Sequence, residues 1–204
     1  MSTSLNVALL ILRVAGGLTL VGHGAQKLFG WFGGPGPTRF GQGLLAQGFR
    51  PLWLWLGLVI IGEVGGGLSL AFGLLTALGA AGAVGAMFMA IAKAHWKNGF
   101  WNSKRGIEFP LQLLAIGAAL GIAGPGDYSL DKLFNLHLPE AALFLPLAAA
   151  ALGVDVIGLA ISRTSAPVPA QVAPGTASAP STPGTSNTPN TPNTPSTPGS
   201  AANG

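Results

Sequence analysis

Glu63 is the only charged residue in an apolar run from Leu52 to Leu75. A run of about 20 apolar residues forms a helix long enough to cross a hydrocarbon layer of about 30 Å. A carboxylate inside that layer costs at least about 2.5–3.5 kcal/mol unless it is paired, protonated or facing water. Because the chain keeps this charge, Glu63 marks both a membrane-spanning segment and a candidate buried polar site.

Arg13 is the expected partner of Glu63, because it lies inside the apolar stretch near the N-terminus. Counting about 1.5 Å of helix rise per residue puts Arg13 roughly 12 Å and Glu63 roughly 13 Å below the outer membrane surface. Matching depths on antiparallel helices predict an Arg13–Glu63 ion pair. Two readings stay open: the pair only fixes helix register, or it forms a polar pocket that holds a ligand or a proton.

A second polar cluster is expected at the opposite, cytoplasmic end of the spans. His23 and Lys27 are four residues apart and therefore share one helix face. Helices that approach the same end contribute the rest of a set expected to converge there: His23, Gln26, Lys27, Lys93, His95 and Glu108. Because imidazole titrates near neutral pH, the two histidines suit proton exchange near a quinone or an anionic headgroup.

The same cluster does not predict a metal site. Two histidines and a carboxylate are suitable metal ligands, but His23, His95 and Glu108 come from three helices and lack tight local spacing. The lysines are expected to extend toward lipid headgroups. We therefore assign no metal.

The composition requires a membrane environment for these residues. Only 8% of the 204 residues are charged, against roughly 25% in soluble domains. The predicted fold is an all-α membrane bundle of four core transmembrane helices plus a fifth. The expected spans are Leu5–Val21 extending towards Lys27, Leu52–Leu75, Thr76–His95, Phe109–Ala123 (with a helix starting nearer Lys104), and Pro139–Ile161. The first is expected to be retained rather than cleaved, since no charge precedes Arg13.

The basic residues indicate orientation rather than nucleic-acid binding, although the sequence pI is near 10. They cluster in the first and third loops, and the positive-inside rule puts such loops in the cytoplasm. We therefore predict a multi-pass protein of the bacterial inner (plasma) membrane, with its N-terminus outside.

Residues 163–204 differ from the rest in composition. This Pro/Thr/Ser-rich tract cannot bury enough apolar surface to offset its ordering entropy, so we predict a disordered tail after a single membrane domain at 4–162. The chain has no cysteine, which excludes thiolate chemistry and disulfide exchange by its own residues. No catalytic-triad or nucleotide-binding motif occurs, and the sequence leaves open whether the protein is an enzyme.

Three segments in succession resemble the DoxX-like (DoxX/DoxD) family of small bacterial integral membrane proteins: LRVAGGLTLVGHGAQKLFGWFGG, then GEVGGGLSLAFGLLTALGAAGAVGAMFMAIAKAHWKNGFW, then GIEFPLQLLAIGAALGIAGPGDYSLDK. The resemblance covers about residues 8–133 and implies a four-helix membrane bundle with a loose link to redox physiology. The positions carried over from the family are Arg13, His23, Gly24, Lys27, Glu63, Gly66, His95, Glu108, Gly124, Gly126 and Asp131.

The function expected from the resemblance is that of a membrane subunit in a quinone-linked redox system, of a thiosulfate- or sulfur-oxidising or an oxidative-stress kind. Its partners would be the lipid bilayer and a redox subunit, with no nucleic acid, and quinone would be its cofactor. Two alternatives stay open. One is a non-catalytic scaffold or assembly factor. The other is a small-molecule permease, which needs a continuous polar path from Glu63 to the inner cluster, and Thr19 and Ser69 alone make that path thin. The sequence does not specify a substrate or an oligomeric state.

Overall fold

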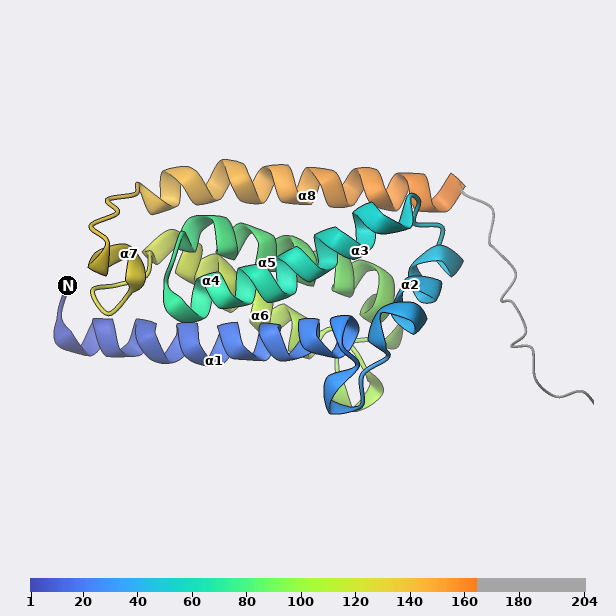
Figure 1. Ribbon diagram of the computed structural model, residues 1–204, viewed down its shortest axis with the longest axis horizontal. Coiled ribbons are helices and arrows are strands. Elements are labelled where there is room, and N and C mark those ends of the chain that lie inside the picture. The colour runs from blue at the N-terminus through green and yellow to red at the C-terminus, as the bar shows by residue number, and fades with distance from the viewer. Residues whose placement is uncertain (165–204) are drawn as a thin grey trace, which may run out of the picture. The chain divides into compact units, whose positions relative to one another are not determined.

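The computed structural model describes residues 1–164, and every regular element within them is a helix. The predicted tail therefore lies outside the described residues, apart from its first two positions. The α-helices, labelled in Figure 1, are α1 (Thr3–Leu28), α2 (Gly36–Ala46), α3 (Leu52–Ile60), α4 (Gly66–Phe72), α5 (Thr76–Ala90), α6 (Glu108–Ala123), α7 (Leu130–Leu133) and α8 (Glu140–Thr164). Two π-helical segments, Ile61–Gly65 and Ile91–His95, continue α3 and α5. Short 3-10 turns lie at Trp31–Gly33, Trp96–Asn98 and Asn102–Lys104.

Among the described residues, four helical segments are long and apolar enough to cross a membrane, which confirms the all-α membrane fold. They are Thr3–Leu28, Leu52–Phe72, Thr76–Asn98 and Glu140–Thr164. The last is the predicted fifth span, and it has full length. The predicted fourth, α6, has only 16 residues. Its expected start near Lys104 is wrong, because Arg105 adopts a left-handed φ of 59° that ends the preceding turn before α6 begins.

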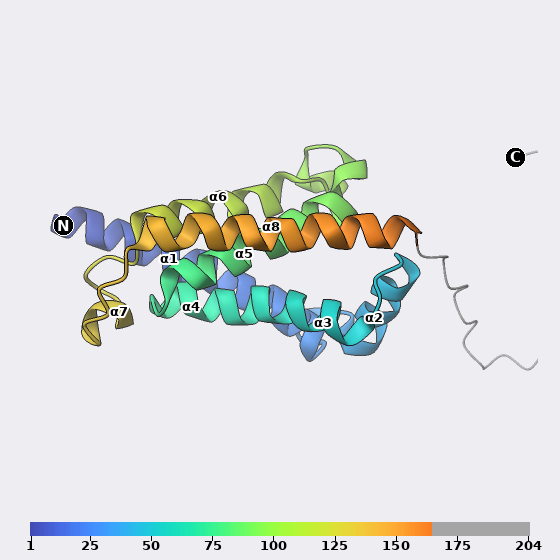
Figure 2. The ribbon, with the colours of Figure 1, turned by 90° about the horizontal axis from the view of Figure 1, so that it is seen from above.

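α5 lies at the centre of the bundle and packs against α4, α6 and α8 (Figures 1 and 2). Its inward positions are mostly small residues, and Ala77, Ala80 and Ala83 are almost completely buried. Because lipid tails remove the hydrophobic drive between helices, such small residues stabilise the bundle by letting backbones approach and make dispersion contacts. α1 packs on the other side of the second span, against α4 and the π-helical segment Ile61–Gly65.

The loop between the first and second spans contains structure that the sequence did not predict. The segment from Gly30 to Gly36 contains the 3-10 turn Trp31–Gly33 and has left-handed φ angles at Gly30, Gly33 and Gly36. The helix α2 that follows buries Leu44 against a small cluster with Phe49 and Trp55. This cluster packs α2 against the first turns of the second span.

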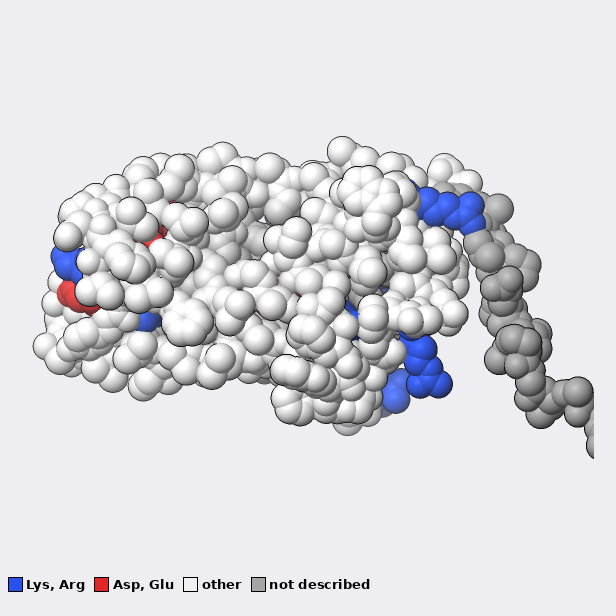
Figure 3. Space-filling view, viewed as in Figure 1, with Lys and Arg blue, Asp and Glu red and all other residues white. Residues whose placement is uncertain are grey.

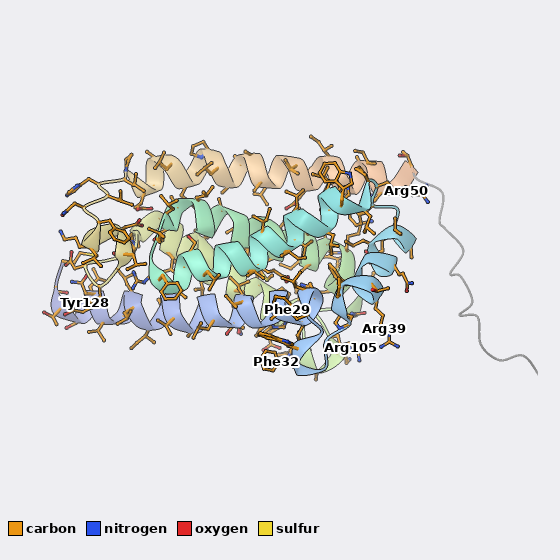
Figure 4. All side chains as sticks on the ribbon, viewed as in Figure 1. Phe29, Phe32, Arg39, Arg50, Arg105 and Tyr128 are labelled. Carbon is orange, nitrogen blue, oxygen red and sulfur yellow. The ribbon has the colours of Figure 1, made fainter. Side chains whose placement is uncertain are left out.

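On the face seen in Figure 3, most exposed charged side chains lie near the two ends of the bundle, and uncharged side chains cover most of the surface between them. Arg39, Arg50 and Arg105 lie at one end, and Tyr128 lies at the other (Figure 4). The first and third loops are therefore at one end of the bundle, as the sequence predicted. The side of the membrane that each end faces stays a prediction.

Candidate functional site

Glu63 lies in the π-helical segment Ile61–Gly65 and is 1% exposed. Its Oε1 accepts a hydrogen bond from the Lys27 ammonium, and the two groups form an ion pair between α1 and the second span. Gly24 makes this approach possible: a Cβ on Gly24 would overlap the Val64 side chain and lie 3.3 Å from the Glu63 Cβ. π-helical turns of this kind occur frequently at functional sites.

The predicted Arg13–Glu63 pair is wrong, because the two helices have a different register. Gly17 packs against Gly67, and Gly24 packs against Val64. Glu63 is therefore level with the second half of α1, about 16 Å along the helix from Arg13. The predicted depths assumed that each apolar run starts at a membrane surface. In the structure, the second span ends at Phe72, and this end, rather than Glu63, is level with Arg13.

One oxygen of Glu63 is left without a partner. Oε2 is buried and accepts no hydrogen bond within the part of the chain that the structure describes. The His23 side chain lies near Gln26, and the charged or titratable groups around it are Glu63, Lys27 and His95. The Glu63 carboxylate thus has one charged partner, a nearby imidazole and one free acceptor oxygen. Lys27, His23, Gln26, Glu63 and His95 are called the Glu63 cluster below.

The structure brings together most, but not all, of the side chains that the sequence predicted to converge. His23 packs against the Phe109 ring, with 5.2 Å between ring centroids. His95 lies at the edge of the cluster, and its Nδ1 is 2.7 Å from the Arg105 carbonyl oxygen. The histidines therefore contact α6 and the loop before it.

Lys93 and Glu108 have other surroundings. The Lys93 ammonium lies over the Phe49 ring, 4.9 Å from its centroid, and its charged neighbours are Arg163 and Lys97. The Glu108 carboxylate accepts a hydrogen bond of 2.8 Å from the Asn102 backbone N–H. Both side chains organise the basic end of the bundle, and neither contributes a contact to Glu63.

Arg13 belongs to a separate polar centre at the opposite end. Its guanidinium donates hydrogen bonds of 2.7 Å to the Pro125 carbonyl and 2.5 Å to the Tyr128 carbonyl. Asp131 is the acidic group close to Arg13. Arg13 therefore binds the loop after α6, and it is called, together with Asp131, the Arg13 centre.

Both carboxylate oxygens of Asp131 accept hydrogen bonds from the α4–α5 turn. Its Oδ1 accepts from the Leu75 N–H at 2.8 Å, and its Oδ2 accepts from the Thr76 N–H at 3.2 Å and the Thr76 hydroxyl at 3.1 Å. Since the first N–H groups of a helix lack partners within it, Asp131 caps α5 from a distant segment. Composition and spacing did not single out Asp131; only the family resemblance did.

Asp127 lies in the loop outside the spans and pairs with Asn6. The Asn6 amide donates to Asp127 at 2.6 Å, and the Asp127 N–H donates to the Asn6 side-chain oxygen at 3.0 Å. The Asn6 hydrogen bond, the N-terminal ammonium and Lys132 together lower the pKa of Asp127 below its usual range. Asp127 is thus held as a charged carboxylate that anchors the start of α1.

The chemistry open to the Glu63 cluster is proton and ligand binding. Lys27 neutralises Glu63, the free Oε2 can accept a hydrogen bond or a proton, and His23 can exchange one. Among the described residues, no group of three or more His, Asp or Glu side chains is arranged to hold a metal ion.

The family model described as DoxX matches residues 8–96, the part of the chain that holds Arg13, the whole Glu63 cluster and Lys93. The inner membrane protein YqjF of Escherichia coli (strain K12) is 30% identical to this chain over 132 residues, which cover 64% of this chain and 94% of that relative. No solved structure matches the chain.

Proposed function

The chain belongs to the DoxX family, and from this premise we propose that it is a multi-pass inner-membrane protein serving as the membrane subunit of a quinone-linked redox system. The observation that carries the proposal is the buried Glu63 carboxylate with one oxygen unpartnered, beside Lys27 and His23. Ionisable groups inside membrane spans are costly, and those that persist commonly mark proton or ligand pathways.

The Glu63 cluster has the parts that a proton-exchanging site needs. A quinone, when bound, accepts two electrons and two protons as it is reduced to a quinol, and the electrons would come from a redox partner subunit. The Glu63 carboxylate is a proton acceptor inside the bundle, and it pairs with the Lys27 ammonium. His23 lies beside the ion pair, and His95 extends the cluster towards the basic end of the bundle, where its Nδ1 is 2.7 Å from the Arg105 carbonyl oxygen. The 20% exposure of the Lys27 side chain gives the pair limited contact with the surface.

The experiment combines ligand identification with a carboxyl-specific signal. The full chain is purified with native lipids, its quinone content is measured by mass spectrometry, and bound quinone is reduced at an electrode while infrared difference spectra are recorded. We expect co-purifying quinone and a carboxyl band that changes on reduction and disappears in Glu63→Gln. Asp127→Asn, at the other end of the molecule, is the matched control and should keep the band.

The outcomes separate the proposal from its alternatives. If neither the wild-type chain nor Glu63→Gln carries quinone, the redox assignment is wrong. If no carboxyl band that changes on reduction is lost in Glu63→Gln, Glu63 is excluded as the proton-exchanging group.

A non-catalytic scaffold is the second candidate, and the Lys27–Glu63 ion pair itself favours it. An opposite-charge pair between α1 and the second span fixes their register whether or not any ligand binds. Loss of folded protein in Glu63→Gln, together with wild-type protein that holds no quinone, would support this role.

A permease role has less support than the redox role or the scaffold role. The Thr19 hydroxyl donates to the Ala15 carbonyl at 2.7 Å, and the Ser69 hydroxyl donates to the Leu74 carbonyl at 2.6 Å. Both hydroxyls are thus engaged by nearby backbone rather than joined into a polar path from Glu63.

A further inference from the structure

An apolar groove lies on the face of the second span opposite Glu63. Its larger part has a volume of about 590 Å³, and its lining includes Ile61, Gly65, Leu68, Phe72, Leu78 and Leu147. A smaller part of about 170 Å³ adjoins it and shares Ile61, Gly82 and Ala151. α8 and the α3–α4 segment form its walls, and α5 lies between them (Figure 2).

The smaller part of the groove contains a carboxyl group that has no oppositely charged partner among the described residues. Asp155 on α8 lines it together with Trp55. The Asp155 Oδ2 is buried without a hydrogen-bond partner, and no basic side chain of the described residues forms an ion pair with it. An unpaired carboxylate in hydrocarbon is strongly unfavourable, so the group is stable there as a neutral acid that donates a hydrogen bond.

The depth of Asp155 restricts what can accept that hydrogen bond. Helix rise puts Asp155 about 22 Å from Glu140 and about 14 Å from Thr164 along α8, well inside the hydrocarbon. Phospholipid headgroups and ester carbonyls stay at the interface and do not reach this depth. The matching acceptor is an uncharged carbonyl on a molecule that is itself apolar.

We propose that this groove binds the ring and apolar chain of a lipid quinone, with the Asp155 carboxyl donating a hydrogen bond to a ring carbonyl. The volume of the larger part fits the usual range of small-molecule sites, roughly 300–1,000 Å³. Among the described residues, its lining consists of apolar side chains and glycines, and Ser69 is its only polar side chain. This assignment rests on the proposed function, because it supposes that the protein binds quinone at all.

Two close contacts show that the groove and Glu63 lie at the same level of the bundle. A Cβ on Gly62 would lie 3.0 Å from the Ala86 side chain, and one on Gly85 would lie 3.4 Å from Asp155 Oδ2. Glu63 and Asp155 are therefore at the same depth, on opposite sides of the glycine-rich π-helical segment. The second span separates the groove from the Glu63 cluster by about one helix diameter, roughly 10 Å.

The test is a binding titration of the full chain in detergent micelles with decylubiquinone, read by quenching of tryptophan fluorescence. Trp55 lines the groove, so we expect saturable quenching whose amplitude falls in Trp55→Phe. Gly65→Leu fills the larger part, where a Cβ would meet only Ile61 at 3.8 Å, and should weaken binding at least tenfold. Asp155→Leu removes one hydrogen bond and should weaken binding roughly threefold to tenfold.

Gly153→Leu is the matched control, because Gly153 is an exposed glycine of α8 and a Cβ added there would have no atom within 4 Å. It should bind decylubiquinone as the wild type does. Gel filtration and the thermal midpoint of each variant establish that it is folded.

Failure of this assignment and failure of the proposed function give different results. If Gly65→Leu and Asp155→Leu quench as the wild type does, quinone binds to the protein but not in this groove. No quenching of the wild type and no co-purifying quinone would remove the proposed function as well. A phospholipid or a second copy of the chain that is retained by wild type and lost in Gly65→Leu would overturn quinone as the occupant.

Discussion

The two buried charged centres are built differently although both lie among the apolar helices. At the Arg13 centre, Arg13 and Asp131 bind mainly backbone groups of the α4–α5 turn and of the loop after α6. At the Glu63 cluster, one side chain binds another, and a carboxylate oxygen is left over. Each centre keeps one buried atom without a hydrogen bond among the described residues, Arg13 Nε and Glu63 Oε2. The guanidinium N–H can only donate, whereas the carboxylate oxygen can accept a hydrogen bond or a proton from a ligand.

Removing Asp131 should have the largest effect on stability. Asp131→Ala takes three hydrogen bonds from the start of α5 and leaves Arg13 without its nearby counter-charge. We expect the free energy of unfolding to fall by about 3–5 kcal/mol, measured by denaturant titration in micelles. The neighbouring Lys132→Ala should change it by less than about 0.5 kcal/mol, since Lys132 is exposed. Equal effects of the two variants would contradict a structural role for Asp131.

The Lys27–Glu63 ion pair should show strong coupling in a double-mutant cycle. Lys27→Met leaves the Glu63 carboxylate buried and uncompensated, so it should cost about 3 kcal/mol. Adding Glu63→Gln should recover at least half of that loss, because no charge then remains in the hydrocarbon. The measured quantity is the unfolding free energy of both single variants and the double variant. Additive losses would show that Lys27 does not neutralise Glu63.

Gly24 allows the close approach at the Glu63 cluster, and its replacement should have a smaller effect. Gly24→Ala puts a methyl group against Val64 and Glu63, and overpacking of this kind costs about 1–3 kcal/mol. Gly22→Ala is the control, since no atom lies within 4 Å of the added carbon, and it should be neutral or slightly stabilising. Thermal midpoints in micelles test this difference, and a harmless Gly24→Ala would mean that α1 is not held this closely.

The smallest effect is expected at Asp127, at the same end as the Arg13 centre. Because folding lowers the pKa of Asp127, its contribution to stability is present above the usual aspartate pKa and is lost as the pH falls through the lower folded value. Asn6→Ala removes the main cause and should raise the pKa of Asp127 towards its usual value. An NMR titration of the carboxyl carbon measures the shift, and an unchanged pKa would rule out Asn6 as its cause.

Particular residues show how far the sequence could predict the site. Lys27, His23 and Glu63 were all identified as candidates, because charged and titratable residues near apolar spans are conspicuous. Their pairing was predicted wrongly, since the stagger of α1 on the second span depends on which glycines meet. The close contacts of Gly17 with Gly67 and of Gly24 with Val64 set that stagger. Small-residue spacing was the available signal, but it fits several registers.

By itself, the sequence determined the membrane environment, the all-α fold and the identity of most polar residues in the spans, because hydrocarbon requires helices and makes charges costly. Only the tertiary structure decided that Lys27 pairs with Glu63 and that Arg13 and Asp131 tie distant segments together. It also decided that Asp155 lines a groove formed by three helices. These features depend on contacts between residues far apart in the chain, and local composition does not specify which helix faces meet or at which height.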